Sequence, residues 1–184
     1  MSEFSDHPFW DFSLDVYMSD GVGQACLDLQ DAHELDVNIV LFCLWVAASG
    51  RGALTAAQMT AVTAAVSEWH HDVVRALRAV RVRMKGGVGD APADLAESLR
   101  QRIQKTEIDC EHTEQLMLAA SVDLTADDGK AADDRVADAV SNIAAYFATL
   151  GTVTDADRTN LGFILKVAFR DVPGERVDAA VAVL

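Results

Sequence analysis

Four ionisable side chains fall on the apolar faces of predicted helices instead of their polar faces: His70, Glu107, Glu111 and Glu114. At about 100° per residue, His70 and Glu107 lie about 40° from the centre of the apolar face of their helix, and Glu114 lies about 20° from it. Glu111 lies at the margin, about 80° away. Carboxylates and an imidazole in such positions suit acid–base chemistry, ligand contact or metal binding, and they also suit an ordinary, partly buried His–Glu pair.

The two helices that carry these side chains are predicted for about residues 56–84 and 93–122, with an apolar face along the whole length of each. The intervening GGVGDAP is a turn, so the helices form an antiparallel hairpin. A turn centred in this loop places His70 within reach of Glu107 or Glu111.

Two further patterns have the carboxylate-to-histidine spacing that di-iron helical bundles use: Glu68-x-x-His71 and Asp109-x-x-His112. The helical wheel turns Glu68, His71 and His112 to the side opposite the apolar face. A metal in a bundle core needs ligands that point inward. We therefore assign no metal site and no cofactor.

Positive charge is concentrated in one segment of an acidic chain. The net charge is −14, yet residues 75–105 hold eight of the fifteen Lys and Arg residues. Such an acidic protein is not expected to bind nucleic acid. The basic side chains complement the dipole of their helix and can pair with nearby acids, or they form a docking surface. The candidates for docking are Arg78, Arg81, Arg83 and Lys85.

The element that must position these groups is an apolar run, IVLFCLWVAA (Ile39–Ala48), which Asp36 is well placed to cap. Ten apolar residues are too few to span a membrane, so the run is predicted as a buried central helix, about residues 37–49. No strand pattern occurs, and the fold prediction is an all-α helical bundle around this helix.

Three segments are expected along the chain. Residues 1–122 form the helical-bundle domain, residues 123–134 an acidic linker, and residues 135–184 a C-terminal helical extension packed on the same core. The three cysteines show no metal-type spacing and the N-terminus does not resemble a secretory signal. A bacterial-type cytoplasmic location is therefore expected.

Three motifs carry a resemblance to a known family: FWDFSLDVY (Phe9–Tyr17), ACLDLQD (Ala25–Asp31) and DVNIVLFCLW (Asp36–Trp45). With them, the chain resembles an uncharacterised bacterial all-helical domain family over about residues 9–121. The resemblance implies a helical fold and brings no established activity.

Two functions follow as hypotheses. The leading one is a non-catalytic protein that docks through its basic segment onto an acidic partner protein or a second copy of itself. The alternative is a small-molecule or metal-binding protein, with or without catalysis. Its polar cluster of Glu107, Glu111, Glu114 and His70 would lie in a pocket between the hairpin and the central helix.

Overall fold

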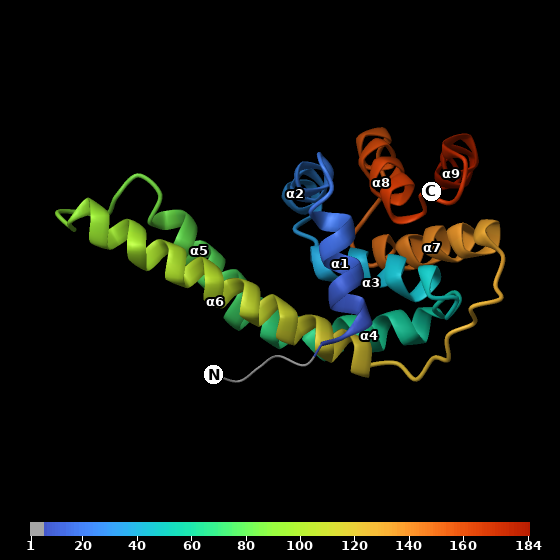
Figure 1. Cartoon of the computed structure of the whole chain (residues 1–184), viewed down its shortest axis with the longest axis horizontal. Coiled ribbons are helices and arrows are strands. Elements are labelled where there is room, and N and C mark those ends of the chain that lie inside the picture. The colour runs from blue at the N-terminus through green and yellow to red at the C-terminus, as the bar shows by residue number, and fades with distance from the viewer. Residues whose placement is uncertain (1–5) are drawn as a thin grey trace.

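The computed structural model describes residues 6–184, and all regular secondary structure in that range is helical (Figure 1). The elements are α1 (Pro8–Tyr17), α2 (Val22–His33), α3 (Val37–Ala48), α4 (Ala56–Trp69), the π-helical turn η1 (His70–Val74), α5 (Arg75–Arg83), α6 (Ala93–Ala120), α7 (Ala132–Phe147), α8 (Asp155–Ala168) and α9 (Gly174–Val181). The all-α prediction is confirmed.

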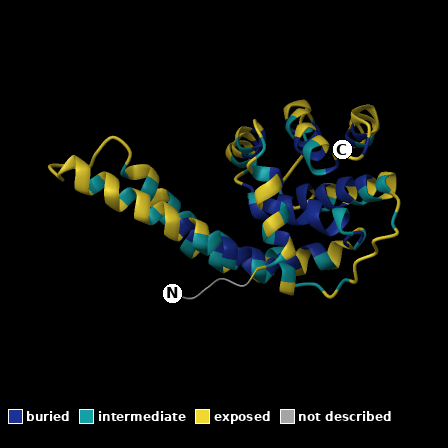
Figure 2. Cartoon of the chain, viewed as in Figure 1, coloured by how far each residue is buried: buried dark blue, intermediate teal, exposed yellow. Residues whose placement is uncertain are grey.

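Helix α3 forms the centre of the body (Figures 1 and 2). Asp36 caps it, since its Oδ1 accepts the N–H of Asn38 at 2.8 Å. Every residue from Asn38 to Ala47 is buried, with α7, α1 and α6 packed around it. A helix that is apolar on all sides needs such cover, and the predicted central helix is confirmed. Among the described residues, no helix combines the length and the apolar character needed to cross a membrane.

The predicted hairpin is also confirmed, with α4, η1 and α5 as one arm and α6 as the other. Its base packs against α3, and its distal part projects from the body (Figure 1). There, Val80, Leu95 and Leu99 are 49, 59 and 49% exposed (Figure 2). The apolar face predicted along each long helix is thus buried only at the base, because the body covers only that part.

The π-turn η1 interrupts the first arm, where the sequence predicts one continuous α-helix over about residues 56–84. A π-turn holds more residues per turn than an α-helix, which shifts the positions that face inward. Val74 is completely buried, while Val73 is only partly so. Such turns are frequent at functional sites, and the first residue of this one is His70.

The C-terminal helices share the core of the body. Helix α7 packs along α3, α8 packs on α2, and α9 packs on α7 and α8. Buried Asn142 of α7 accepts the N–H of Leu54 at 2.6 Å and donates to the carbonyl of Cys43 at 3.2 Å. These contacts connect α7 to α3 and to the segment just before α4. The division into domains at residues 122 and 135 stays a prediction.

A candidate ligand-binding cleft with a buried carboxylate–histidine cluster

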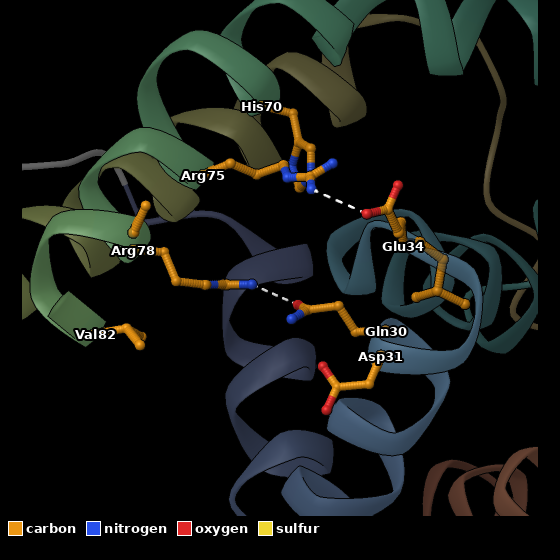
Figure 3. Close-up of a pocket in the computed structure, with 9 residues that line it drawn as sticks. Gln30, Asp31, Glu34, His70, Arg75, Arg78 and Val82 are labelled. Atoms are coloured by element: carbon orange, nitrogen blue, oxygen red, sulfur yellow. Dashed lines mark hydrogen bonds and ion pairs between the residues drawn. The ribbon is translucent and has the colours of Figure 1, made fainter.

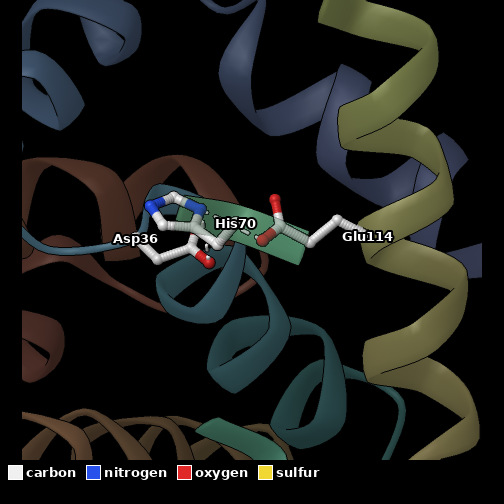
Figure 4. A group of neighbouring side chains, drawn as sticks. All are labelled: Asp36, His70 and Glu114. Carbon is white, nitrogen blue, oxygen red and sulfur yellow. Dashed lines mark hydrogen bonds and ion pairs between the residues drawn. The ribbon is translucent and has the colours of Figure 1, made fainter. Parts of the chain in front are cut away.

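Three ionisable side chains meet where the base of the hairpin contacts the start of α3 (Figure 4). Asp36 comes from the cap of α3, His70 from η1 and Glu114 from α6. His70 Nδ1 lies 3.0 Å from Glu114 Oε1 and 3.2 Å from Asp36 Oδ2. Their exposed fractions are 6% for Asp36, 7% for His70 and 0% for Glu114. We refer to Asp36, His70 and Glu114 as the inner cluster.

Asn38 orients both carboxylates of the inner cluster. Its backbone N–H donates to Asp36 Oδ1 at 2.8 Å, and its side-chain Nδ2 donates to Glu114 Oε2 at 2.7 Å. The Asn38 amide is held in turn by Gln115, whose Nε2 donates to Asn38 Oδ1 at 2.9 Å. Each carboxylate is thus anchored through one oxygen and presents the other to His70.

The inner cluster has more negative than positive groups in a buried place, and its pKa values reflect this. Burial, followed by the negative charge of Glu114, raises the pKa of Asp36 to about 8, although His70 and the Asn38 N–H oppose the shift. Burial lowers the pKa of His70, but the hydrogen bond to Glu114 and the charges of Asp36 and Glu114 outweigh it, so the net shift is upward. The cluster therefore favours a bound cation or proton.

A second group, the outer cluster, lies further along the hairpin and consists of Arg78, Arg81, Glu107 and Glu111. Arg78 Nε donates to Glu107 Oε1 at 2.9 Å, and Arg81 Nη2 donates to the same oxygen at 3.1 Å. Arg78 Nη2 also donates to Glu111 Oε1. Burial raises the pKa of Glu107, but the hydrogen bonds from Arg81 and Arg78 outweigh it and leave that pKa lowered. For Glu111 burial dominates, and its pKa is raised despite Arg78.

Both clusters open onto a cleft of about 500 Å³ between the hairpin and α1, α2 and α3. Asp36 and His70 line its inner end, and aromatic side chains of α1, Trp10 and Tyr17, line a wall. A neighbouring hollow of about 430 Å³ lies between α2 and α5 and also reaches His70 (Figure 3). Arg78 lines both spaces and donates to Gln30 of α2.

The structure separates the four side chains on which the alternative hypothesis rests. His70 pairs with Glu114, whereas Glu107 and Glu111 pair with arginines. The prediction that His70 meets Glu107 or Glu111 is wrong because helical side chains tilt toward the N-terminus of their own helix. In an antiparallel hairpin that tilt carries His70 toward the C-terminal end of α6, where Glu114 lies.

The predicted basic positions also divide into two groups. Arg78 and Arg81 point into the cleft and are engaged by glutamates. Arg83 and Lys85 are exposed near the end of α5, where Arg83 Nη1 donates to the carbonyl of Gly87 at 3.4 Å. This second pair is exposed as a docking surface requires, although Lys85 also lines the mouth of the cleft.

The i,i+3 pairs behave differently from each other. Glu68 and His71 are exposed, as the helical wheel predicts. His112, however, is 7% exposed and stacks on Trp10 with ring centroids 4.1 Å apart. The outward prediction for His112 is wrong because α1 covers the face of α6 opposite the hairpin's apolar contact.

Sequence reasoning identified Asp36 as a helix cap and missed its place in the site. A capping carboxylate uses one oxygen for the helix, and its second oxygen is available to a neighbour. A buried cap next to an apolar helix is a signal that could have indicated this second contact.

No curated protein and no solved structure matches the chain. A family model matches residues 8–118, a range that contains every member of both clusters. The expected resemblance to an uncharacterised domain family over about residues 9–121 is thereby confirmed. The chain belongs to the family described as "Protein of unknown function (DUF2390)".

Proposed function

We propose that this protein binds a small polar molecule in the cleft between the hairpin and α1–α3. The observation that carries the proposal is that buried ionisable groups, Asp36 and His70, form the inner end of a cleft of about 500 Å³. Concave sites of this size with a few convergent polar groups are the usual form of small-molecule sites. Ionisable groups with shifted pKa values in a cleft add to that support.

The lining suggests the class of ligand. Trp10 and Tyr17 offer aromatic surface, and Leu14 and Leu41 offer aliphatic surface. The polar groups are gathered at the two clusters. A molecule with a flat apolar body and one or two hydrogen-bonding groups fits this division, because its body would pack on α1 while its polar end reached a cluster.

Ligand-observed NMR with a fragment panel of aromatic amines, carboxylates and amides tests the proposal, in the presence of EDTA so that metal ions play no part. Leu14→Trp narrows the cleft from the α1 side, where Leu14 is 40% exposed. The matched control is Leu95→Trp, at a site 59% exposed on the distal hairpin. We expect bound fragments to be lost in Leu14→Trp and kept in Leu95→Trp. Absence of any bound fragment, or equal loss in both variants, would refute the proposal.

Docking of a second copy through the distal hairpin is the other candidate. It is favoured by the exposed apolar side chains Val80, Leu95 and Leu99 of the distal hairpin. Exposed apolar groups gathered in this way often mark an interface. The neighbouring cations Arg83 and Lys85 complement a chain whose net charge is −14.

Sedimentation velocity measures this association. We expect the wild-type dimer to dissociate more readily as the salt concentration rises from about 50 to 500 mM. The double variant Arg83→Glu with Lys85→Glu should be monomeric. The matched control is Arg158→Glu, since Arg158 lies on α8 and forms an exposed ion pair with Asp155. This candidate would be refuted if the wild-type protein remained monomeric at all concentrations. It would also be refuted if the double variant formed a dimer as stable as that of the wild type.

A further inference from the structure

We propose that the inner cluster is a binding site for one divalent transition-metal ion, held by Asp36 Oδ2, His70 Nδ1 and Glu114 Oε1. The proposal goes beyond small-molecule binding in the cleft and does not depend on it, because the three ligand atoms belong to the chain itself. Their residues come from three separate elements: the cap of α3, the π-turn η1 and the middle of the buried half of α6.

The geometry of the three atoms suits a shared ion. They lie within 4.8 Å of one another, with Nδ1 at 3.0 and 3.2 Å from the two oxygens. Nitrogen and oxygen ligands bind first-row metals at about 2.0–2.2 Å, so two ligands of one ion lie about 3–4 Å apart. Small side-chain rotations would bring all three atoms to that distance from one centre.

The surrounding hydrogen bonds resemble the support that metal ligands need. Asn38 occupies Asp36 Oδ1 and Glu114 Oε2, which leaves Oδ2 and Oε1 directed toward His70. Such outer contacts fix the orientation of metal ligands and hold them in place before the ion arrives. Gln115 donates to Asn38 and accepts from the Ser13 hydroxyl at 2.9 Å, so the support extends to α1.

A buried oxygen without a hydrogen bond is the independent observation. Asp36 is 6% exposed, and its Oδ2 accepts no hydrogen bond from the residues that the structure describes. Nδ1 carries at most one hydrogen, and it faces two carboxylate oxygens. That one hydrogen cannot satisfy both oxygens, so the group needs either a further proton on Asp36 or a cation, and one divalent cation can bind both oxygens and the nitrogen at once.

An ion held there would be accessible from the cleft, because Asp36 and His70 line it. Three protein ligands with an open position are the arrangement of metal sites that bind a further ligand, in contrast to closed structural sites. One imidazole nitrogen with two carboxylate oxygens suits Zn²⁺ or Mn²⁺ better than the thiolate-preferring ions. The three cysteines of the chain lie outside this group.

Isothermal titration of the EDTA-treated, dialysed protein with ZnCl₂ and with MnCl₂ tests the site. We expect one ion per chain for at least one of the two metals. Loss of a residue that only hydrogen-bonds to a metal ligand weakens metal binding by about 10- to 100-fold. His70→Gln removes a ligand itself, so it should weaken binding by about 100-fold or more. His71→Gln is the matched control, because His71 is the exposed neighbour on the same turn and should bind as the wild type does.

A spectroscopic measurement on the wild type keeps the test independent of whether His70→Gln folds. Pulsed electron paramagnetic resonance of bound Mn²⁺, or the visible spectrum of Co²⁺ in its place, reports a coordinated imidazole nitrogen. Binding without an imidazole signal, equal binding by a folded His70→Gln, or no stoichiometric binding of Zn²⁺ or Mn²⁺ would each overturn the proposal. The fragment screen of the cleft is run in EDTA, so it tests small-molecule binding in the absence of metal. Either proposal can therefore fail without the other.

Discussion

The inner and outer clusters both lie at the hairpin, and in each a glutamate of α6 pairs with a nitrogen-containing side chain of the opposite arm, while the inner cluster adds Asp36 from the cap of α3. In the outer cluster two arginines face two glutamates, so the charges match, and the arginine side chains are 18 and 27% exposed. In the inner cluster one histidine faces two carboxylates, and all three residues are at most 7% exposed. The deeper site is therefore the one with two carboxyl groups for a single base, and the raised pKa of Asp36, about 8, means that this carboxyl holds a proton at neutral pH.

The difference indicates what each cluster does for the molecule. Matched, hydrogen-bonded ion pairs fix the two arms of the hairpin and leave little capacity for another ligand. A buried excess of negative charge is costly unless a proton or a cation offsets it. The outer cluster is thus a structural connection, and the inner cluster has the character of a binding site.

The largest expected effect comes from removing the base of the inner cluster. His70→Ala leaves the buried carboxylate of Glu114 without its cationic partner, which should lower the free energy of unfolding of the metal-free protein by about 3–5 kcal/mol. Urea unfolding followed by circular dichroism measures it. His71→Ala, at an exposed site, should change stability by at most about 0.5 kcal/mol. A decrease of less than about 1 kcal/mol in the free energy of unfolding of His70→Ala would mean that His70 does not stabilise the buried carboxyl groups.

The outer cluster should respond less to the loss of one member. Glu107→Gln removes the shared acceptor of Arg78 and Arg81, but Glu111 remains and water reaches both guanidinium groups. We expect a loss of about 1–2 kcal/mol in the same urea experiment. Glu97→Gln disrupts an exposed ion pair with Arg100 and should leave the urea midpoint unchanged. If Glu107→Gln cost as much as His70→Ala, the proposed contrast between the clusters would fail.

The pH dependence of stability identifies the charge state of Glu107. Its pKa is lower in the folded protein than the ordinary value of 4.5, because the arginine hydrogen bonds outweigh burial. Such a carboxyl contributes stability above the unfolded pKa and loses it as the pH falls through the folded pKa. The stability difference between wild type and Glu107→Gln should therefore be constant above about pH 6 and shrink below about pH 4.5. Unfolding midpoints across that range measure it, and a difference independent of pH would contradict the ionised pair.

The smallest expected effect lies beyond both clusters, on the distal hairpin. Leu99→Gln replaces a side chain that is 49% exposed, so stability should change by at most about 0.5 kcal/mol. The same change should weaken any dimer detected by sedimentation velocity. A stability loss above about 1 kcal/mol would show that Leu99 packs more closely than its exposure indicates.

The apolar run and the turn between the long helices were sufficient to predict α3 and the hairpin, because both follow from local sequence patterns. The partners of His70 and the burial of His112 were not predictable from a helical wheel. The wheel gives the direction of a side chain around one helix, but it omits the tilt along the axis and the helices that pack outside. The π-turn at His70 has no sequence signal that we recognise. The contact between Asp36 and His70 was not predictable either, because it forms only when folding brings α3, η1 and α6 together.

The central prediction for this protein is that the inner cluster binds a cation. Anomalous X-ray diffraction from crystals of the wild-type protein grown with ZnCl₂, recorded on both sides of the zinc absorption edge, tests this most directly. The predicted result is one strong anomalous peak per chain about 2.0–2.2 Å from Asp36 Oδ2, His70 Nδ1 and Glu114 Oε1. A cluster without a peak, with the carboxyl groups of Asp36 and Glu114 hydrogen-bonded to each other, would contradict it.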